Sequence, residues 1–329
     1  AGERGTRQGR TRAMARAAHH EAVGDFDYAL TALTHLPEQR DTREQAIDLR
    51  LALRSALLPS RDSERILACL REAEALAVLL NDPRRLGQIA GFLSAHFRNR
   101  GVYDQSIAAA QRALTLATAD QDVVLQALVH QNLGAAYWAQ GDYVRAIDCL
   151  EQTATSLSGA QRHERFGQAI LPSVQSRAFL AACHAELGRF TDGNVLGEEG
   201  LQIAEAVAHP LSLMIALWGG GQLSLRQGDL HGALPQLERA MGLCQDVDLP
   251  VVFPWMAAAL GAAYTLGGRA ADAIPLLMQA TAQSTATENV HVETLCSLPL
   301  GEAHLAAGSM EAAHTLAERT LALARAHQE

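Results

Sequence analysis

The stretch that decides the fold runs from residue 128 to residue 150 and reads LVHQNLGAAYWAQGDYVRAIDCL. Its two glycines, Gly134 and Gly141, lie seven residues apart and enclose Tyr137 and Trp138. Glycine adopts the left-handed backbone conformation that ends many helices, so Gly141 is predicted to close one helix before the next begins. Gly134 is predicted to let the paired helix approach closely, and Tyr137 to fill the seam between the two helices.

The same sequence pattern recurs along the chain: a glycine closes one helix, and a small residue, usually alanine, follows five residues later in the next helix. The glycines of this pattern are Gly24, Gly101, Gly141, Gly188, Gly228, Gly268 and Gly308. From Gly101 onward they lie 40, 47, 40, 40 and 40 residues apart. The gap of 77 residues between Gly24 and Gly101 leaves room for one further unit near Arg61. The sequence therefore predicts eight units.

Each unit also has fixed places for small and large side chains. The small residues lie seven positions before the turn glycine and are Ala17, Ser94, Gly134, Ala181, Gly221, Gly261 and Gly301. Nine positions after the turn an apolar residue is usual, as at Leu150, Leu237 and Leu277. Two antiparallel helices need such slots to interlock and to stack on their neighbours.

We therefore expect an all-α protein, a single α-α superhelix of about eight helix pairs that occupies residues 1–329. The predicted repeats are roughly 11–40, 42–80, 82–119, 121–158, 174–207, 210–246, 249–287 and 289–327, with an insertion at 158–174. Low aromatic content, 5% of residues, agrees with helices packed through alanine and leucine rather than with a β-sandwich.

The pattern L-G-x-x-Y-x-x-x-G-x-Y-x-x-A, from Leu133 to Ala146, resembles the tetratricopeptide repeat (TPR). A period of 40 residues is longer than the usual ~34 of that repeat, so each unit is expected to hold two helices of about 15 to 18 residues. The resemblance implies a scaffold whose inner helices line a concave binding face.

Four longer stretches, 46–59, 84–117, 163–190 and 197–219, look like the TPR region that follows the ATPase module in certain bacterial signalling proteins. Those proteins join an adenylate/guanylate cyclase-type or other regulatory domain to a nucleotide-driven switch. The resemblance implies a sensor or docking arm, with an upstream ATPase or cyclase module as partner where the chain is part of a longer one. A looser likeness, to the repeat sensor domain of maltose-regulator-type transcription activators, implies binding of a small inducer.

Composition argues against several other classes of function. The formal net charge is −9, and the one basic run, Arg4 to Arg16, is interpreted as a frayed end, so no nucleic-acid partner is expected. The chain contains no lysine, which excludes a P-loop and a Schiff-base lysine within it. No catalytic, metal-binding or cofactor-binding constellation is recognised, so we predict a protein that is not an enzyme.

Cysteine usage and hydropathy predict a cytoplasmic location. The five cysteines contain no C-x-x-C pair, as expected for free thiols in a reducing compartment. No apolar run approaches the ~18 residues of a membrane span, and no signal peptide is recognised, so no membrane partner is expected.

The candidate ligand groove is predicted from the geometry of the TPR family, in which certain slots before each turn glycine face the concave side. All three tryptophans of the chain fall on such slots, surrounded by polar side chains. The predicted groove residues are Trp138, Trp218, Trp255, Arg98, Asn99, Gln131, Gln175, Gln222 and Arg226. Indole offers a large apolar contact at low entropy cost, which suits the anchoring of a peptide. The alternative is that the tryptophans pack between neighbouring inner helices.

These residues lead to two hypotheses of function. The first is a scaffold or sensor arm that binds a protein or peptide segment in its groove; the second is a sensor for a small molecule. The insertion at 158–174, followed by Gly193, Gly197 and Gly200, is predicted to form a hinge or a lip for a ligand, or else a tolerated surface loop.

Overall fold

The computed structural model describes residues 21–58, 62–247 and 252–327, and these residues contain helices and no β-strand. Residues 21–33 form the first described helix. The others are α2 (Arg40–Leu57), α3 (Ser63–Leu80), α4 (Pro83–Asn99), α5 (Tyr103–Ala119), α6 (Val123–Ala139), α7 (Tyr143–Ser156), the 3-10 helix η1 (Gly159–His163), α8 (Pro172–Glu186), α9 (Phe190–Val207), α10 (Pro210–Gln227), α11 (Leu230–Val247), α12 (Phe253–Leu266), α13 (Ala270–Ala286), α14 (Val290–Ala306) and α15 (Met310–His327). The predicted all-α, TPR-like superhelix is confirmed.

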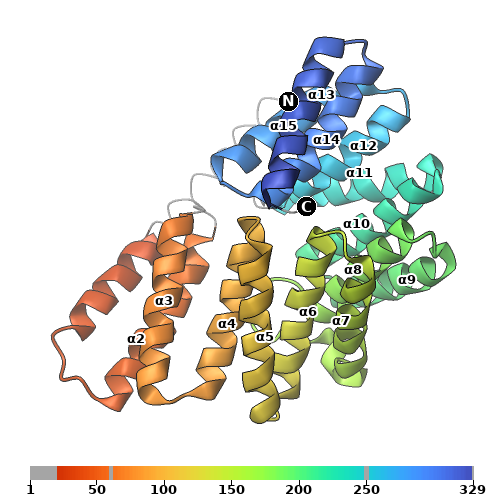
Figure 1. Cartoon of the computed structure of the whole chain (residues 1–329). Coiled ribbons are helices and arrows are strands. Elements are labelled where there is room, and N and C mark those ends of the chain that lie inside the picture. Colours follow the sequence, from red (N-terminus) through yellow and green to blue (C-terminus); the bar gives the residue numbers. More distant parts are fainter. Residues whose placement is uncertain (1–20, 59–61, 248–251, 328–329) are drawn as a thin grey trace.

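The helices pack as antiparallel hairpins that follow one another around a curved path (Figure 1). Within the described ranges these are seven hairpins, from α2/α3 to α14/α15, preceded by the helix at 21–33. The even-numbered helices from α4 to α14 contact one another in sequence and form the inner layer. Their odd-numbered partners cover them from outside.

The turns between the paired helices occur where the sequence predicts them, with one exception. Six of the predicted glycines have φ between +68° and +78°, the left-handed region that favours glycine: Gly101, Gly141, Gly188, Gly228, Gly268 and Gly308. The turn predicted at Gly24 is wrong, because Gly24 lies inside the helix at 21–33. The beginning of the predicted repeat 11–40, the basic run Arg4 to Arg16 and the turn residue Arg61 lie outside the described residues.

The small and large slots meet directly in several repeats. A Cβ atom added to Gly134 would lie 2.5 Å from Leu150 Cγ, and one added to Gly261 would lie 2.5 Å from Leu277 Cγ. Each leucine therefore rests on the bare backbone of the glycine in the paired helix. Tyr137 is buried at the same seam, with the guanidinium carbon of Arg145 4.5 Å from the centre of its ring.

The glycines of α9 serve packing, and the helix is continuous through them from Phe190 to Val207. A Cβ atom at Gly193 would lie 2.7 Å from Leu223 Cδ1 of α10, and one at Gly200 would lie 3.2 Å from Arg177 Cβ of α8. These contacts give the glycines a structural reason that needs no hinge.

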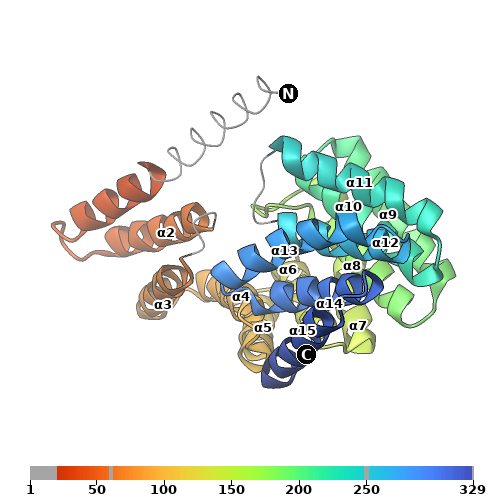
Figure 2. The same cartoon turned by 90° about the horizontal axis from the view of Figure 1, so that it is seen from above.

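The superhelix curves far enough for its last hairpin to reach α4 and α5. Both views show α14 and α15 returning to lie beside the ends of these two helices (Figures 1 and 2). The Tyr103 hydroxyl lies 3.2 Å from His291 Nδ1, and His327 Nδ1 lies 3.2 Å from the carbonyl oxygen of Gly101. An ion pair between Arg100 and Glu288 completes this closure. The inner surface is therefore enclosed rather than open along its length.

Replacing Gly134 by alanine should lower the free energy of unfolding by about 1–3 kcal/mol, because the new methyl group overlaps Leu150. Gly242→Ala in α11 is the matched control: a Cβ there meets nothing within 4 Å, so this change should be neutral or add up to about 1 kcal/mol. Urea unfolding followed by circular dichroism measures both. Equal effects of the two substitutions would contradict the interlock.

Candidate functional site

Five rings from five consecutive inner helices meet at the centre of the curved array. They are Trp138 of α6, Phe179 of α8, Trp218 of α10, Trp255 of α12 and His291 of α14, and we call them the aromatic hub. Trp138 stacks on Trp255 with 5.8 Å between ring centres and 22° between planes, and it meets Trp218 edge-on at 5.8 Å. Such offset and edge-to-face pairs add stability beyond the area that they bury.

The structure brings the three predicted tryptophans together on the inner side, yet it packs them against one another. Trp218 is only 2% exposed, so its indole offers no free face to a ligand in this conformation. Trp138 and Trp255 are partly buried. The expectation of an open wall of indoles is thus corrected to a closed cluster, because the curvature draws the inner helices around one centre. A role of Trp138 and Trp255 in ligand contact stays a prediction.

The other predicted groove residues are dispersed. Gln131 Nε2 donates to Gln175 Oε1 at 2.5 Å, which joins α6 to α8. Arg226 is exposed and pairs with Glu186 of α8, with 2.7 Å between Nε and Oε1. Gln222 lies partly buried on α10. Gln131, Gln175 and Arg226 thus link neighbouring repeats, and the role of all four residues in binding also stays a prediction.

Arg98 and Asn99 end α4 close to the closure. Burial lowers the pKa of Arg98 below its ordinary value, and the charge of Tyr103 acts in the opposite direction. Asn99 is exposed and lines a small cavity described below.

A cavity of about 620 Å³ lies along the inner helices α2, α4 and α6. Its wall comprises Asp48 and Arg54 of α2; Asp82, Arg84, Arg85, Gln88, Gly91, Phe92 and Ala95 at the start and along α4; Asp122, Val124, Leu125, Leu128, Val129 and Asn132 at the start and along α6; and Phe166 and Gln168 of the insertion. Four of these, Gln88, Gly91, Ala95 and Leu128, occupy slots for which the TPR resemblance implies an inward direction.

The insertion contributes to this wall through Phe166 and Gln168. It forms the helix η1 and then turns at Phe166 and Gly167, whose φ values of 49° and 75° are both left-handed. The backbone N–H of Leu171 donates to Ser212 Oγ at 3.0 Å, and the Ser173 hydroxyl donates to the carbonyl oxygen of Arg162. Among the three alternatives for the insertion, this geometry favours the lip.

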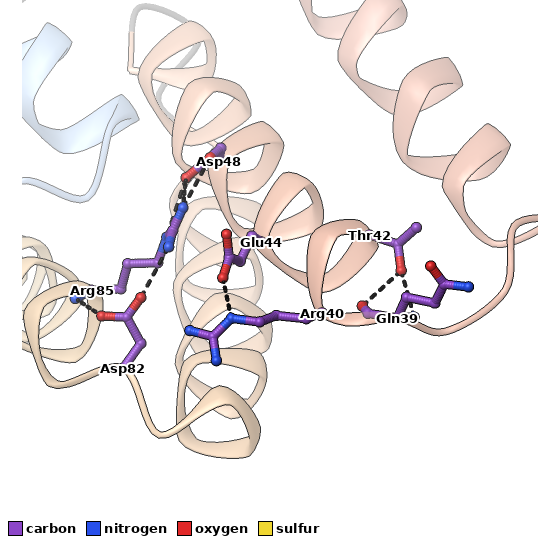
Figure 3. A network of polar contacts seen from close by, with 7 residues as sticks. All are labelled: Gln39, Arg40, Thr42, Glu44, Asp48, Asp82 and Arg85. Atoms are coloured by element: carbon purple, nitrogen blue, oxygen red, sulfur yellow. Dashed lines mark hydrogen bonds and ion pairs between the residues drawn. The ribbon is translucent and has the colours of Figure 1, made fainter.

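Acidic side chains concentrate where α4 and α6 begin. Arg85 lies between Asp82, 2.9 Å away, and Asp48 of α2, 3.1 Å away (Figure 3). Burial alone would raise the pKa of Asp82, but hydrogen bonds from the backbone and the guanidinium of Arg85 outweigh it and hold the pKa below its ordinary value. Arg84 Nε lies 3.6 Å from Asp122. At this end of the cavity every arginine has a carboxylate partner.

Arg54 differs from these arginines. Its guanidinium carbon lies 4.2 Å from the centre of the Phe92 ring, and its Nε is buried without a hydrogen-bond acceptor in the described part of the chain. Burial lowers the pKa of Arg54 to about 10, so the side chain remains charged at neutral pH. A buried cation without an acidic partner is costly, and the contact with an aromatic face offsets only part of that cost.

A smaller cavity of about 110 Å³ adjoins the first, and Arg54 and Ala95 line both. Its wall also includes His96, Asn99 and Arg100 of the α4 end and Thr287, Glu288 and Asn289, which lead into α14. Burial, and then the charges of Arg100, Arg54 and Arg71, lower the pKa of His96 to about 4. Arg54, Arg71 and Arg100 thus act together on His96.

Sequence reasoning missed the larger cavity: none of the nine predicted groove residues lines it, and only Asn99 lines the smaller one. The prediction followed the tryptophans, whereas the cavity lies in the repeats before them. A usable signal was present, because Asp82 and Arg85 precede an inward stripe that contains Gln88 and Gly91.

The described residues contain neither a metal-binding cluster nor a membrane-spanning helix. No group of three or more histidine, cysteine, aspartate or glutamate side chains is placed to hold a metal ion in the described ranges. None of the helices described there has the length and hydropathy needed to cross a bilayer.

Comparison with known proteins agrees with the repeat architecture. Residues 85–157 match the tetratricopeptide repeat family model. A curated relative, the 43 kDa receptor-associated protein of the synapse from Tetronarce californica, is 24% identical over 162 residues, which are 49% of this chain and 38% of the relative. The matched part therefore spans well under half of that protein.

Solved structures with low sequence identity share the fold. A Rap protein complexed with competence and sporulation factor has a TM-score of 0.64 at 12% identity, over 95% of this chain and 99% of the other. The Rap conjugation gene regulator of the plasmid pLS20 in complex with the Phr* peptide has a TM-score of 0.59 at 11% identity, over 93% and 84%. The TPR-sensor STAND protein PH0952 from Pyrococcus horikoshii has 0.56 at 12%, over 86% and 41%.

Trp218→Ala should lower the free energy of unfolding by about 3–5 kcal/mol, because it leaves a large void at the centre of the aromatic hub. Gln222→Ala, one turn later on α10, is the control: Gln222 makes no polar contact within the described part of the chain, so the change should alter stability by less than about 0.5 kcal/mol. Denaturation followed by far-UV circular dichroism compares them. A tolerated Trp218→Ala would show that the hub does not hold the inner helices together.

The stability should fall as the pH decreases from about 6.5 to about 4, in part through His96. Because its folded-state pKa lies below the unfolded value, the unfolded chain takes up the proton first, and the stability present above pH ~6.5 is lost on the acid side. After allowance for partial solvent exposure, the contribution of His96 is about 1–2 kcal/mol. His96→Gln should flatten this pH dependence, as denaturant midpoints at about pH 7.5 and about pH 4.5 would reveal. An unchanged slope would exclude the contribution.

Proposed function

We propose that this protein is a non-enzymatic scaffold or sensor arm that binds a peptide segment of a partner protein in the cavity along α2, α4 and α6. The single observation that carries the proposal is the cavity itself, a preformed hollow on the inner side of a TPR-like array. We place this role in a bacterial signalling protein, with an ATPase module as a further partner where the chain continues.

The dimensions of the cavity suit an extended peptide. Its lining runs from Arg84 to Ala95 on α4 and from Asp122 to Asn132 on α6. A span of about eleven helical residues is about 16 Å long, which corresponds to about five residues of extended chain. A peptide of this length fits along the two inner helices.

The lining supplies both apolar contact and polar groups. Leu125, Leu128 and Val129 give α6 an apolar stripe, and Phe166 extends it from the insertion. Asn132 Nδ2 donates to the carbonyl oxygen of Gly91 at 3.3 Å and ties the two inner helices together. A wall of mixed character in a largely preformed site is typical of ligand pockets, in which a few polar groups fix the orientation of the ligand.

Fold similarity supports a peptide over a small inducer. One similar structure is a Rap regulator in complex with the Phr* peptide, and another is a Rap protein complexed with competence and sporulation factor. At 11–12% identity these likenesses concern the fold alone. The choice of peptide-contacting residues therefore rests on the cavity of this chain.

Selection from a random library of peptides of about seven residues tests the proposal. The immobilised protein should enrich a peptide family that fails to bind Gly91→Leu, because a Cβ at Gly91 meets only Asn132 Nδ2, at 3.7 Å, and the longer side chain would occupy the cavity. Gly242→Leu, at an open position of α11, should bind as the parent protein does. Enriched peptides that bind all three proteins equally would overturn the assignment of this cavity.

A further inference from the structure

We infer that the ligand of the larger cavity presents a carboxylate to the guanidinium of Arg54, where that side chain lies on Phe92 between the two cavities. The inference rests on the proposed function and deepens it, because it gives the bound segment a chemical group and an orientation.

Among the described residues, Arg54 lacks the acidic partner that comparable arginines have. On the same helix, Arg50 Nε pairs with Glu72 at 2.8 Å. Across the cavity, Arg85 has two aspartates. Arg54 has only the face of Phe92, and its Nε has no acceptor in the described residues. An anion brought by the ligand would satisfy a donor that the protein leaves open.

Arg54 lines both the 620 Å³ cavity and the 110 Å³ cavity, so an anion there lies at the junction of the two. The smaller cavity is also lined by Arg100, which is paired with Glu288, and by His96, whose pKa is lowered first by burial and then by the charges of Arg100, Arg54 and Arg71. A negative charge at this junction lies beside the guanidinium of Arg54, and in a partly desolvated place this attraction is stronger than at an open surface.

The geometry of the Arg54 guanidinium favours a carboxylate as the anion. The planar guanidinium donates two parallel hydrogen bonds to a carboxylate, and the stacked contact with Phe92 already fixes its plane. The same cavity also contains Asp48, Asp82 and Asp122. A phosphate dianion would be repelled by these three side chains more strongly than a singly charged carboxylate.

The two ends of the cavity then orient a peptide. Asp48 and Arg54 lie six residues apart on α2, about 9 Å along the helix axis. The carboxylate at the C-terminus of the peptide lies at the Arg54 end. The N–H groups of the preceding residues run toward Asp48 and Asp82.

A matched pair of probes tests this contact: an acetylated Leu-Ala-Leu tripeptide with a free carboxyl terminus, and the same tripeptide with a terminal amide. Binding is followed through the NMR signal of the Arg54 Nε–H group and by calorimetry. The free acid should bind the wild-type protein at least about tenfold more tightly than the amide, the gain expected from a charge-assisted pair of hydrogen bonds. Acetate at the same concentration distinguishes a peptide-borne carboxylate, which should bind more tightly, from any small carboxylate.

The preference for the acid should disappear in Arg54→Gln and persist in Arg50→Gln, a control on the same helix whose side chain is held by Glu72. Equal binding of acid and amide to the wild-type protein, no binding of the acid, or a preference that survives Arg54→Gln would each overturn the inference. The comparison within the wild-type protein needs no variant to fold.

The failure of this inference differs from the failure of the proposed function. In one outcome, library peptides depend on the cavity, carry no carboxylate at a fixed place and bind Arg54→Gln normally. That result would contradict the carboxylate contact and leave the proposed peptide binding intact. A carboxylate preference at Arg54 without any cavity-dependent peptide would support the anion contact and contradict the proposed peptide binding.

Discussion

The structure depends on one contact repeated along the chain, in which a leucine of the outer helix rests on the bare backbone of a glycine in its inner partner. Gly134 with Leu150, Gly221 with Leu237, and Gly261 with Leu277 all follow this scheme. The glycine removes a side chain where the helix axes come closest, and the leucine restores the packing density that such a gap would lose. Three hairpins share this close contact, and similar packing within successive hairpins lets them stack in nearly the same way, which gives a regular superhelix.

Curvature accumulated over the hairpins produces the two features that matter for function. It draws five inner helices around one centre, where Trp138, Trp218 and Trp255 become a packed cluster instead of a lining. It also brings α14 and α15 to α4 and α5, where Tyr103 meets His291. The larger cavity lies on the part of the inner side before this closure, beside α2.

The sequence could predict the features that depend on local backbone conformation and on contacts with one partner helix. Turn glycines and small slots depend on local backbone and on one partner helix, and those from Gly101 onward were found as expected. Gly24 shows the limit of the same signal, because a glycine without a packing partner is tolerated inside a helix. Closure of the superhelix depends on small rotations added over many repeats, which no single repeat reveals. The tryptophans were therefore placed on the correct side but in the wrong environment.

The distribution of charge follows from the same periodicity. Several ion pairs join residues one repeat apart, such as Arg85 with Asp48, Arg112 with Glu74 and Arg226 with Glu186, separated by 37, 38 and 40 positions. Stacking places equivalent positions of adjacent hairpins side by side, so an arginine at one is met by an acid at the next. These exposed pairs contribute little stability individually. Arg54 interrupts that pattern at the junction of the two cavities. It lies on the Phe92 ring and has no acidic partner among the described residues, so under the proposed carboxylate contact the ligand would supply the balancing charge.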